Sequence, residues 1–271
     1  MQARLYARRH FLPGPGAWVP RNGWIDGIPT ALMSVGIHTI PRTPEVRSAF
    51  AHCSAAWVRT AKGAVELRGA GLDERDIVLA PDMVFAMPEL EVPGATRRAG
   101  EQILLARLGL STPAAIFHAA TFHGWPQEKV EATLRTLSHL PVVVLSLGAY
   151  SGEDRVLAAA ARRIGVHALT DLGPSEITAV LAAAGAVFTT SMHAAIVASS
   201  FGTPVLVPGV KKTAEAFATT PLPPRLEGVD DNDISKVITE SIGHRHSHDP
   251  EPNATAAAQA FKRTLELSGI A

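Results

Sequence analysis

Residues 185–217 read GAVFTTSMHAAIVASSFGTPVLVPGVKKTAEAF, and this stretch decides the fold. An apolar run ends in a polar turn that contains Ser191, and His193 then opens a segment of small residues that predicts a helix ending at Gly202. A second apolar run, at 205–207, follows directly. The order strand, polar turn, helix, strand is typical of α/β proteins with parallel sheets.

The basic side chains of this stretch fall where α/β proteins bind anions. His193 stands at the N-terminus of the predicted helix, where backbone N–H groups and the helix dipole attract negative charge. Lys211 and Lys212 lie in a predicted loop after the second strand, and open α/β sheets bind their ligands at the carboxyl ends of strands. We therefore expect an anionic ligand at this edge of the sheet.

The rest of the chain repeats the alternation of strands and helices, which implies parallel sheets covered by helices on both faces and joined by right-handed crossovers. Strands are predicted at 30–37, 55–59, 76–82, 114–119, 141–148, 166–172, 186–190 and 205–207. Further helices are predicted at 45–52, 60–71, 126–139, 153–164, 175–184 with Ser175 as N-cap, 234–242 and 254–267.

One segment interrupts this pattern. Residues 88–100 read PELEVPGATRRAG, with two prolines, two glycines and four charged side chains, and this composition predicts a linker. The alternation of strands and helices starts again after it. We therefore expect two sheets with a cleft between them.

Composition excludes several classes of function. The 271-residue chain has 25 Lys and Arg against 25 Asp and Glu, which gives no support for binding nucleic acid or an anionic membrane. Cys53 is the only cysteine, which excludes an intramolecular disulfide or a thiolate zinc cluster and favours a reducing compartment. No apolar run approaches the ~18 residues that span a bilayer, and no signal peptide is recognisable. We expect a cytoplasmic protein without a membrane span.

Several motifs together resemble the polysaccharide pyruvyl transferase family. SVGIH at 34–38 is followed by AAWVRTAKGAVELRGAGL at 55–72 and by IVLAPDMVF at 77–85. FTTSMHAAIVASSFGTPVLV at 188–207 is similar to the family's Arg-(Met/Leu)-His segment with its small-residue helix and Gly-x-Pro, and a lysine follows it.

The resemblance implies a two-domain α/β fold like that of GT-B glycosyltransferases, with two Rossmann-like parallel sheets. Because only three strands are predicted in the N-terminal half, where about five are expected for a doubly wound domain, we expect an abbreviated first domain. We expect a partial N-terminal domain at 1–95, a donor-binding domain at 101–250, and a final helix within 251–271 that packs back on the first domain.

The resemblance also implies an activity. Family members transfer a pyruvyl group from phosphoenolpyruvate to hydroxyls of a sugar or polysaccharide, forming a ketal, and no cofactor is expected. The family's exposed Arg corresponds to Arg59, its His to His193, and its Lys to Lys211 in preference to Lys212. Where the family has an Arg two residues before the His, this chain has Ser191.

Elementary chemistry fits these assignments. The His193 imidazole, which titrates near neutrality, could act as a general acid or bind an anion, or it could merely cap its helix. Arg59 could grip a carboxylate in bidentate fashion, or it could form a surface ion pair with Asp82 or Glu66. Ser191 and His123, the latter in the loop after strand 114–119, complete the candidate substrate-binding residues.

Two other functions stay open at this point. A GT-B glycosyltransferase or nucleotide-sugar 2-epimerase would use the same helix N-terminus for a diphosphate, and an inactive relative would bind a glycan or another protein. A homo-oligomer is also compatible with the sequence. No metal is expected, because the spacing of His244, His246 and His248 fits no known zinc signature.

Overall fold

The structure is a computed structural model that describes most of the chain in two compact units. The first unit comprises Met1–Met83, Ala218–Thr220 and Thr255–Ala271, and the second comprises Val84–Phe217 and Pro221–Ala254. The described residues are 30–37, 40, 43–44, 47, 50, 53–90, 93–111, 113–119, 125–147, 153–208, 211–220, 234–243 and 250–269.

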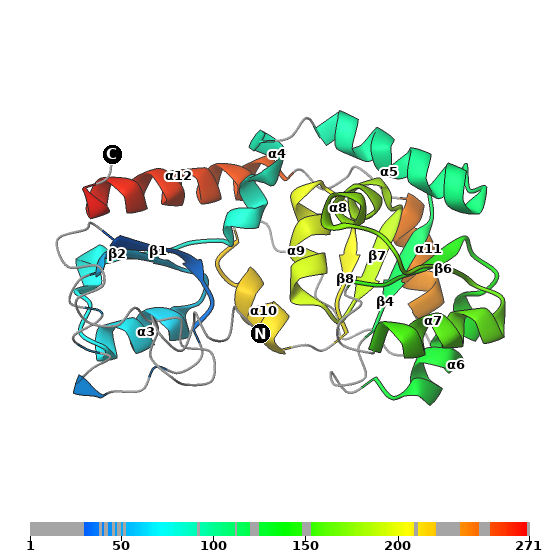
Figure 1. Cartoon of the computed structure of the whole chain (residues 1–271), viewed down its shortest axis with the longest axis horizontal. Helices are drawn as coiled ribbons and strands as arrows, with labels where there is room; N and C mark the ends of the chain where they lie inside the picture. Colours follow the sequence, from blue (N-terminus) through cyan, green and yellow to red (C-terminus); the bar gives the residue numbers. More distant parts are fainter. Residues whose placement is uncertain are drawn as a thin grey trace, which may run out of the picture. The chain divides into compact units, whose positions relative to one another are not determined.

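The second unit is built on a five-stranded parallel sheet with the order β6-β5-β4-β7-β8 (Figure 1). Numbered along the chain, this is the order 3-2-1-4-5 of a Rossmann-type sheet, and the direction of winding reverses between β4 and β7. The strands are β4 (Ala115–His118), β5 (Val142–Leu145), β6 (His167–Leu169), β7 (Ala186–Thr189) and β8 (Val205–Leu206).

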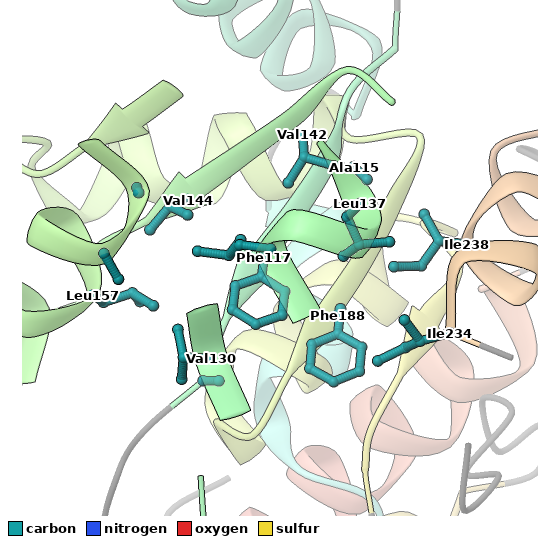
Figure 2. Close-up of a cluster of buried hydrophobic side chains, with 14 of the residues drawn as sticks. Ala115, Phe117, Val130, Leu137, Val142, Val144, Leu157, Phe188, Ile234 and Ile238 are labelled. Carbon is teal, nitrogen blue, oxygen red and sulfur yellow. The ribbon is translucent and has the colours of Figure 1, made fainter. Parts of the chain in front are cut away.

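Helices cover both faces of this sheet. The rings of Phe117 and Phe188 stack on one face with centroids 5.0 Å apart, under apolar side chains such as Leu137, Leu157 and Ile238 (Figure 2). These come from α6 (Gln127–Leu137), α7 (Glu153–Ile164) and α11 (Ile234–Gly243). The other face carries α8 (Pro174–Ala183) and α9 (Met192–Ser200) (Figure 1).

The prediction of a linker at 88–100 is wrong, because most of this segment is helical. Helix α4 covers Met87–Leu90 and α5 covers Pro93–Leu108. Pro93 does not break α5, since proline fits the first turn of a helix, where its missing N–H has no helical partner. Gly100 lets α5 pack closely on α8: a Cβ atom there would come within 2.0 Å of the Ala179 carbonyl oxygen.

Two predicted helix starts also differ from the structure. The segment with Lys211 and Lys212 is not a loop but the start of α10 (Lys211–Phe217), whose sequence KKTAEAF is free of Gly and Pro. Helix α8 has Gly173 and not Ser175 as its N-cap, because Pro174 fits the first helical position and the Glu176 carboxylate accepts the Gly173 N–H at 2.8 Å.

The first unit holds a smaller parallel sheet with the order β1-β2-β3. Cys53, Val58 and Leu67 belong to its buried apolar core. Helix α3 lies on one side of the sheet, and the part of α12 that belongs to this unit lies on the other (Figure 1). The elements are β1 (Thr30–Val35), β2 (Cys53–Val58), α3 (Ala61–Gly69), β3 (Ile77–Leu79) and α12 (Glu251–Ser268).

The predicted fold class, α/β with two parallel Rossmann-like sheets, is confirmed. All eight predicted strands are present: β2 begins two residues earlier than predicted, at Cys53, and the other seven are shorter than predicted. Each sheet has one edge at which all of its strands end, so residues that follow different strands gather there.

Candidate functional site

In the second unit, β4 and β7 are the neighbouring strands between which the direction of winding reverses, and backbone hydrogen bonds join them up to their carboxyl ends. His118 pairs with Thr189 in the parallel ladder, and the N–H of Thr190 donates to the His118 carbonyl at 3.1 Å. The turn that leads into α9 is therefore fixed to the central strand. Ligands of open α/β sheets bind beside such a reversal point.

Ser191 is the N-cap of α9. Its backbone is extended, with φ −86° and ψ 119°, and its Oγ accepts the N–H of Ala194 at 3.4 Å. The Thr189 hydroxyl in turn accepts the Ser191 N–H at 2.9 Å. Ser191, and not His193, caps the helix, so the capping interpretation of His193 is wrong.

His193 is the exposed residue of a helix that is otherwise buried or half-buried. It occupies the second position of α9, and its neighbours Met192 and Ala194 are buried. An anion that binds the backbone N–H groups of this first turn would therefore have the His193 side chain beside it.

His118 has a structural role. The residue is 8% exposed, and Nδ1 of its ring lies 3.2 Å from the Leu145 carbonyl oxygen. Because a carbonyl can only accept, Nδ1 carries the proton of this hydrogen bond. His118 is therefore a packed, hydrogen-bonded histidine of the sheet.

The other candidates of the second unit are placed only in part. Lys211 and Lys212 are the first residues of α10, and the structure describes their backbone only. His123 lies outside the described residues. The roles of these side chains stay predictions.

In the first unit, Arg59 and Asp82 form an ion pair at the carboxyl edge of the sheet. Arg59 follows β2, and its Nη1 donates to Oδ2 of Asp82, which follows β3. The side chains are 14% and 5% exposed, so the pair is not the surface pair that we considered. Glu66 makes a different contact, accepting the N–H of Ile40 at 3.1 Å.

Residues that the sequence analysis did not single out hold this pair. The fully buried Trp57 donates its indole N–H to the Pro81 carbonyl at 3.0 Å. Gly36 leaves room for the guanidinium, because a Cβ atom there would lie 2.1 Å from Nη2 of Arg59. Gly36 lies within the SVGIH motif of the sequence analysis, but nothing in the sequence indicated that it contacts Arg59.

Arg59 and His193 thus stand at carboxyl sheet edges of different units. That they face one cleft stays a prediction. Within the described residues, no group of three His, Cys, Asp or Glu side chains could hold a metal, and residues 244–249 lie outside this part. No described helix is both long enough and apolar enough to cross a membrane.

Solved structures with a similar fold include UDP-GlcNAc 2-epimerases. The Neisseria meningitidis enzyme matches with a TM-score of 0.59 and 15% identity over 89% of this chain and 70% of that chain. The Methanocaldococcus jannaschii enzyme matches with a TM-score of 0.55 and 11% identity over 86% of this chain and 68% of that chain. This chain covers 65% of a further UDP-N-acetylglucosamine 2-epimerase. Identities this low show a shared fold alone.

Among curated proteins, no sequence matches this chain. The family model of polysaccharide pyruvyl transferase matches residues 24–208, which include both sheet edges described above. Because this match extends over more than half of the sequence, the chain belongs to the polysaccharide pyruvyl transferase family.

Proposed function

We propose that this protein transfers the pyruvyl group of phosphoenolpyruvate to a pair of hydroxyls on a sugar or polysaccharide, forming a ketal and releasing phosphate. Family membership supports the reaction type. The observation that carries the assignment of the site is His193, an exposed imidazole in the first turn of the otherwise buried or half-buried α9, beside the reversal point of a Rossmann-type sheet.

The reaction makes three demands on the protein. Cations or N–H groups must hold the phosphate and carboxylate of the donor, a proton must reach its methylene carbon, and a sugar hydroxyl must attack the adjacent carbon. Protonation turns the methylene into a methyl group and leaves positive charge on the carbon that carries the phosphate. Attack by one hydroxyl, loss of phosphate and attack by the second hydroxyl complete the ketal.

His193 is the residue that we assign to proton delivery or to the phosphate. An imidazole can donate a proton to a substrate, and the N–H groups of the first helical turn favour a nearby anion. Arg59 and Lys211 are assigned to the anionic groups of the donor, Arg59 because a guanidinium matches a carboxylate with two parallel hydrogen bonds. Ser191 supports the site by capping the helix that presents His193.

The test is formation of the ketal methyl group, followed by proton NMR in mixtures of the protein, phosphoenolpyruvate and sugar acceptors. We expect His193→Ala to reduce the rate by a factor on the order of 100 or more, the usual contribution of a positioned acid. His167→Ala is the matched control, because His167 is also exposed but opens β6 at the opposite edge of the sheet. An unchanged rate for His193→Ala would contradict the assignment.

Sugar-nucleotide chemistry is the second candidate, and the shared fold with UDP-GlcNAc 2-epimerases favours it. A diphosphate would bind at the same N-terminus of α9, but a nucleotide also needs groups that hold its base and ribose. The acidic residue nearest in sequence after β8 is Glu215, which is half-buried within α10. Binding of UDP in preference to phosphoenolpyruvate would favour this candidate.

A further inference from the structure

The Arg59 guanidinium contacts two residues of the first unit. Nη1 is bonded to Asp82, and Nη2 lies against Gly36, the residue that follows β1. Only 14% of the Arg59 side chain is exposed. Arg59 is thus held between the ends of β1 and β3, with little freedom to change its orientation.

Asp82 is itself fixed on both sides along the chain. Before it, the Trp57 indole donates to the carbonyls of Ala80 and Pro81 at 3.4 and 3.0 Å. After it, the N–H of Met83 donates to the Ser34 hydroxyl at 2.9 Å.

Ser34 adopts a strained backbone to make this bond. Its φ is 51°, the one positive value among the described residues other than glycine, and it interrupts the register between β1 and β2. Such conformations persist where the surrounding structure imposes them, and they cluster at functional sites. Contacts from β1 and β2 therefore hold the backbone on both sides of Asp82, the residue whose carboxylate pairs with Arg59.

We propose that Asp82 is a positioning residue: it orients the Arg59 guanidinium so that its remaining N–H groups face the anionic donor, while Gly36 keeps the space that this orientation needs. The inference rests on the proposed function, in which Arg59 binds phosphoenolpyruvate. A guanidinium has five N–H donors in one plane, so a carboxylate bound on one side leaves an edge for a second anion.

The opposite role for Asp82 would be to neutralise Arg59. In that case Asp82 would repel an anionic ligand, and its removal would tighten binding of phosphoenolpyruvate. Positioning predicts weaker binding after the same change. The direction of the effect therefore separates the two roles.

Two substitutions perturb Arg59 in independent ways. Gly36→Ala places a methyl group against the far end of a flexible side chain, so the guanidinium must move while the backbone need not. Asp82→Asn keeps the shape of the side chain but removes its charge. Because a hydrogen bond to a charged group contributes about 10- to 100-fold in affinity, we expect both substitutions to raise the Kd for phosphoenolpyruvate by about 10- to 100-fold.

The control is Glu74→Gln, which breaks the ion pair between Arg68 and Glu74 in the same unit. That pair is exposed, so the Kd should stay unchanged. Titration calorimetry measures the Kd of each variant, and thermal unfolding checks that each is folded. If Asp82→Asn does not fold, Gly36→Ala decides alone.

The outcomes separate this inference from the function on which it rests. Wild-type protein that binds no phosphoenolpyruvate contradicts both. In a second outcome, the wild-type protein binds phosphoenolpyruvate, and folded Gly36→Ala and Asp82→Asn bind it equally well or more tightly. This result contradicts the positioning role and leaves the proposed function standing. If both variants bind phosphoenolpyruvate more weakly than the wild type while Glu74→Gln binds it with unchanged affinity, the result supports the positioning role.

Discussion

At the scale of single residues, Ser191 and His193 have different roles at the start of α9: Ser191 caps the helix, and His193 exposes its side chain. Ser191 is the N-cap of this helix and His193 is its second residue, so the sequence analysis placed the imidazole correctly at the helix N-terminus. The signal for the cap was also present, since serine is among the strongest N-cap residues. Ser191 stands where the family has an Arg, so this chain has a helix cap at that position.

Ser191→Ala should destabilise the second unit by about 1 kcal/mol, because the first turn of α9 loses the side-chain oxygen that accepts the Ala194 N–H. Urea unfolding measures the difference. Ser191→Asn keeps an N-cap oxygen and should unfold like the wild type. Equal stability of Ser191→Ala and the wild type would show that the cap contributes nothing.

The Arg59–Asp82 ion pair could be predicted from the sequence only in part. The sequence suggested the pair, since Arg59 and Asp82 are the last residues of the predicted strands 55–59 and 76–82. It could not indicate that the pair is enclosed, because enclosure depends on Gly36 and Trp57, which only the parallel pairing of β1, β2 and β3 brings to the same place.

At the scale of elements, apolar runs predicted all eight strands because each is buried or half-buried along most of its length. The helix α5 was missed because its first half has a proline, two glycines and two arginines, a composition that is also typical of a linker. Tertiary contacts decide in favour of the helix: Arg97 donates to the carbonyls of Ala182 and Phe201, at 3.4 and 3.0 Å, near the C-terminal ends of α8 and α9.

Gly100→Ala should destabilise the second unit by about 1–3 kcal/mol, since the new methyl group would overlap the backbone of α8. Gly94→Ala is the matched control on the same helix, where the Cβ atom would meet only Arg98 Nη1 at 3.5 Å. Urea unfolding should show the control to be as stable as the wild type or slightly more stable. A Gly100→Ala variant of wild-type stability would exclude the close packing of α5 on α8.

Glu131 connects α6 and α7, and its contribution to stability should depend on pH. The hydrogen bond from the Gln127 amide, followed by that from Arg163, lowers the pKa of Glu131 below its usual value. A lowered pKa in the folded state stabilises the protein above the pKa of the unfolded state, and this stabilisation is lost as pH falls through the folded value.

Glu131→Gln should therefore reduce the urea midpoint at neutral pH and have a progressively smaller effect in acid. Arg163→Gln removes one partner, and the double variant measures the coupling between the two side chains. A difference between wild type and Glu131→Gln that stays constant from neutral to strongly acid pH would contradict the lowered pKa.

At the scale of the whole molecule, alternation along the chain predicted two parallel sheets but not their strand order. Pairing of β4 with β7 joins segments about 70 residues apart, and no local pattern encodes such a partner. The order nevertheless decides the site, because the direction of winding reverses only between β4 and β7 in the five-stranded sheet.

The central claim is that an anionic pyruvyl donor binds at the N-terminus of α9, next to His193. Titration calorimetry of the wild type and of His193→Ala with phosphoenolpyruvate, and separately with UDP, tests it most directly. We predict that phosphoenolpyruvate binds the wild type, that His193→Ala weakens this binding, and that UDP alone gives no comparable heat. Tight binding of UDP with no binding of phosphoenolpyruvate would contradict the claim.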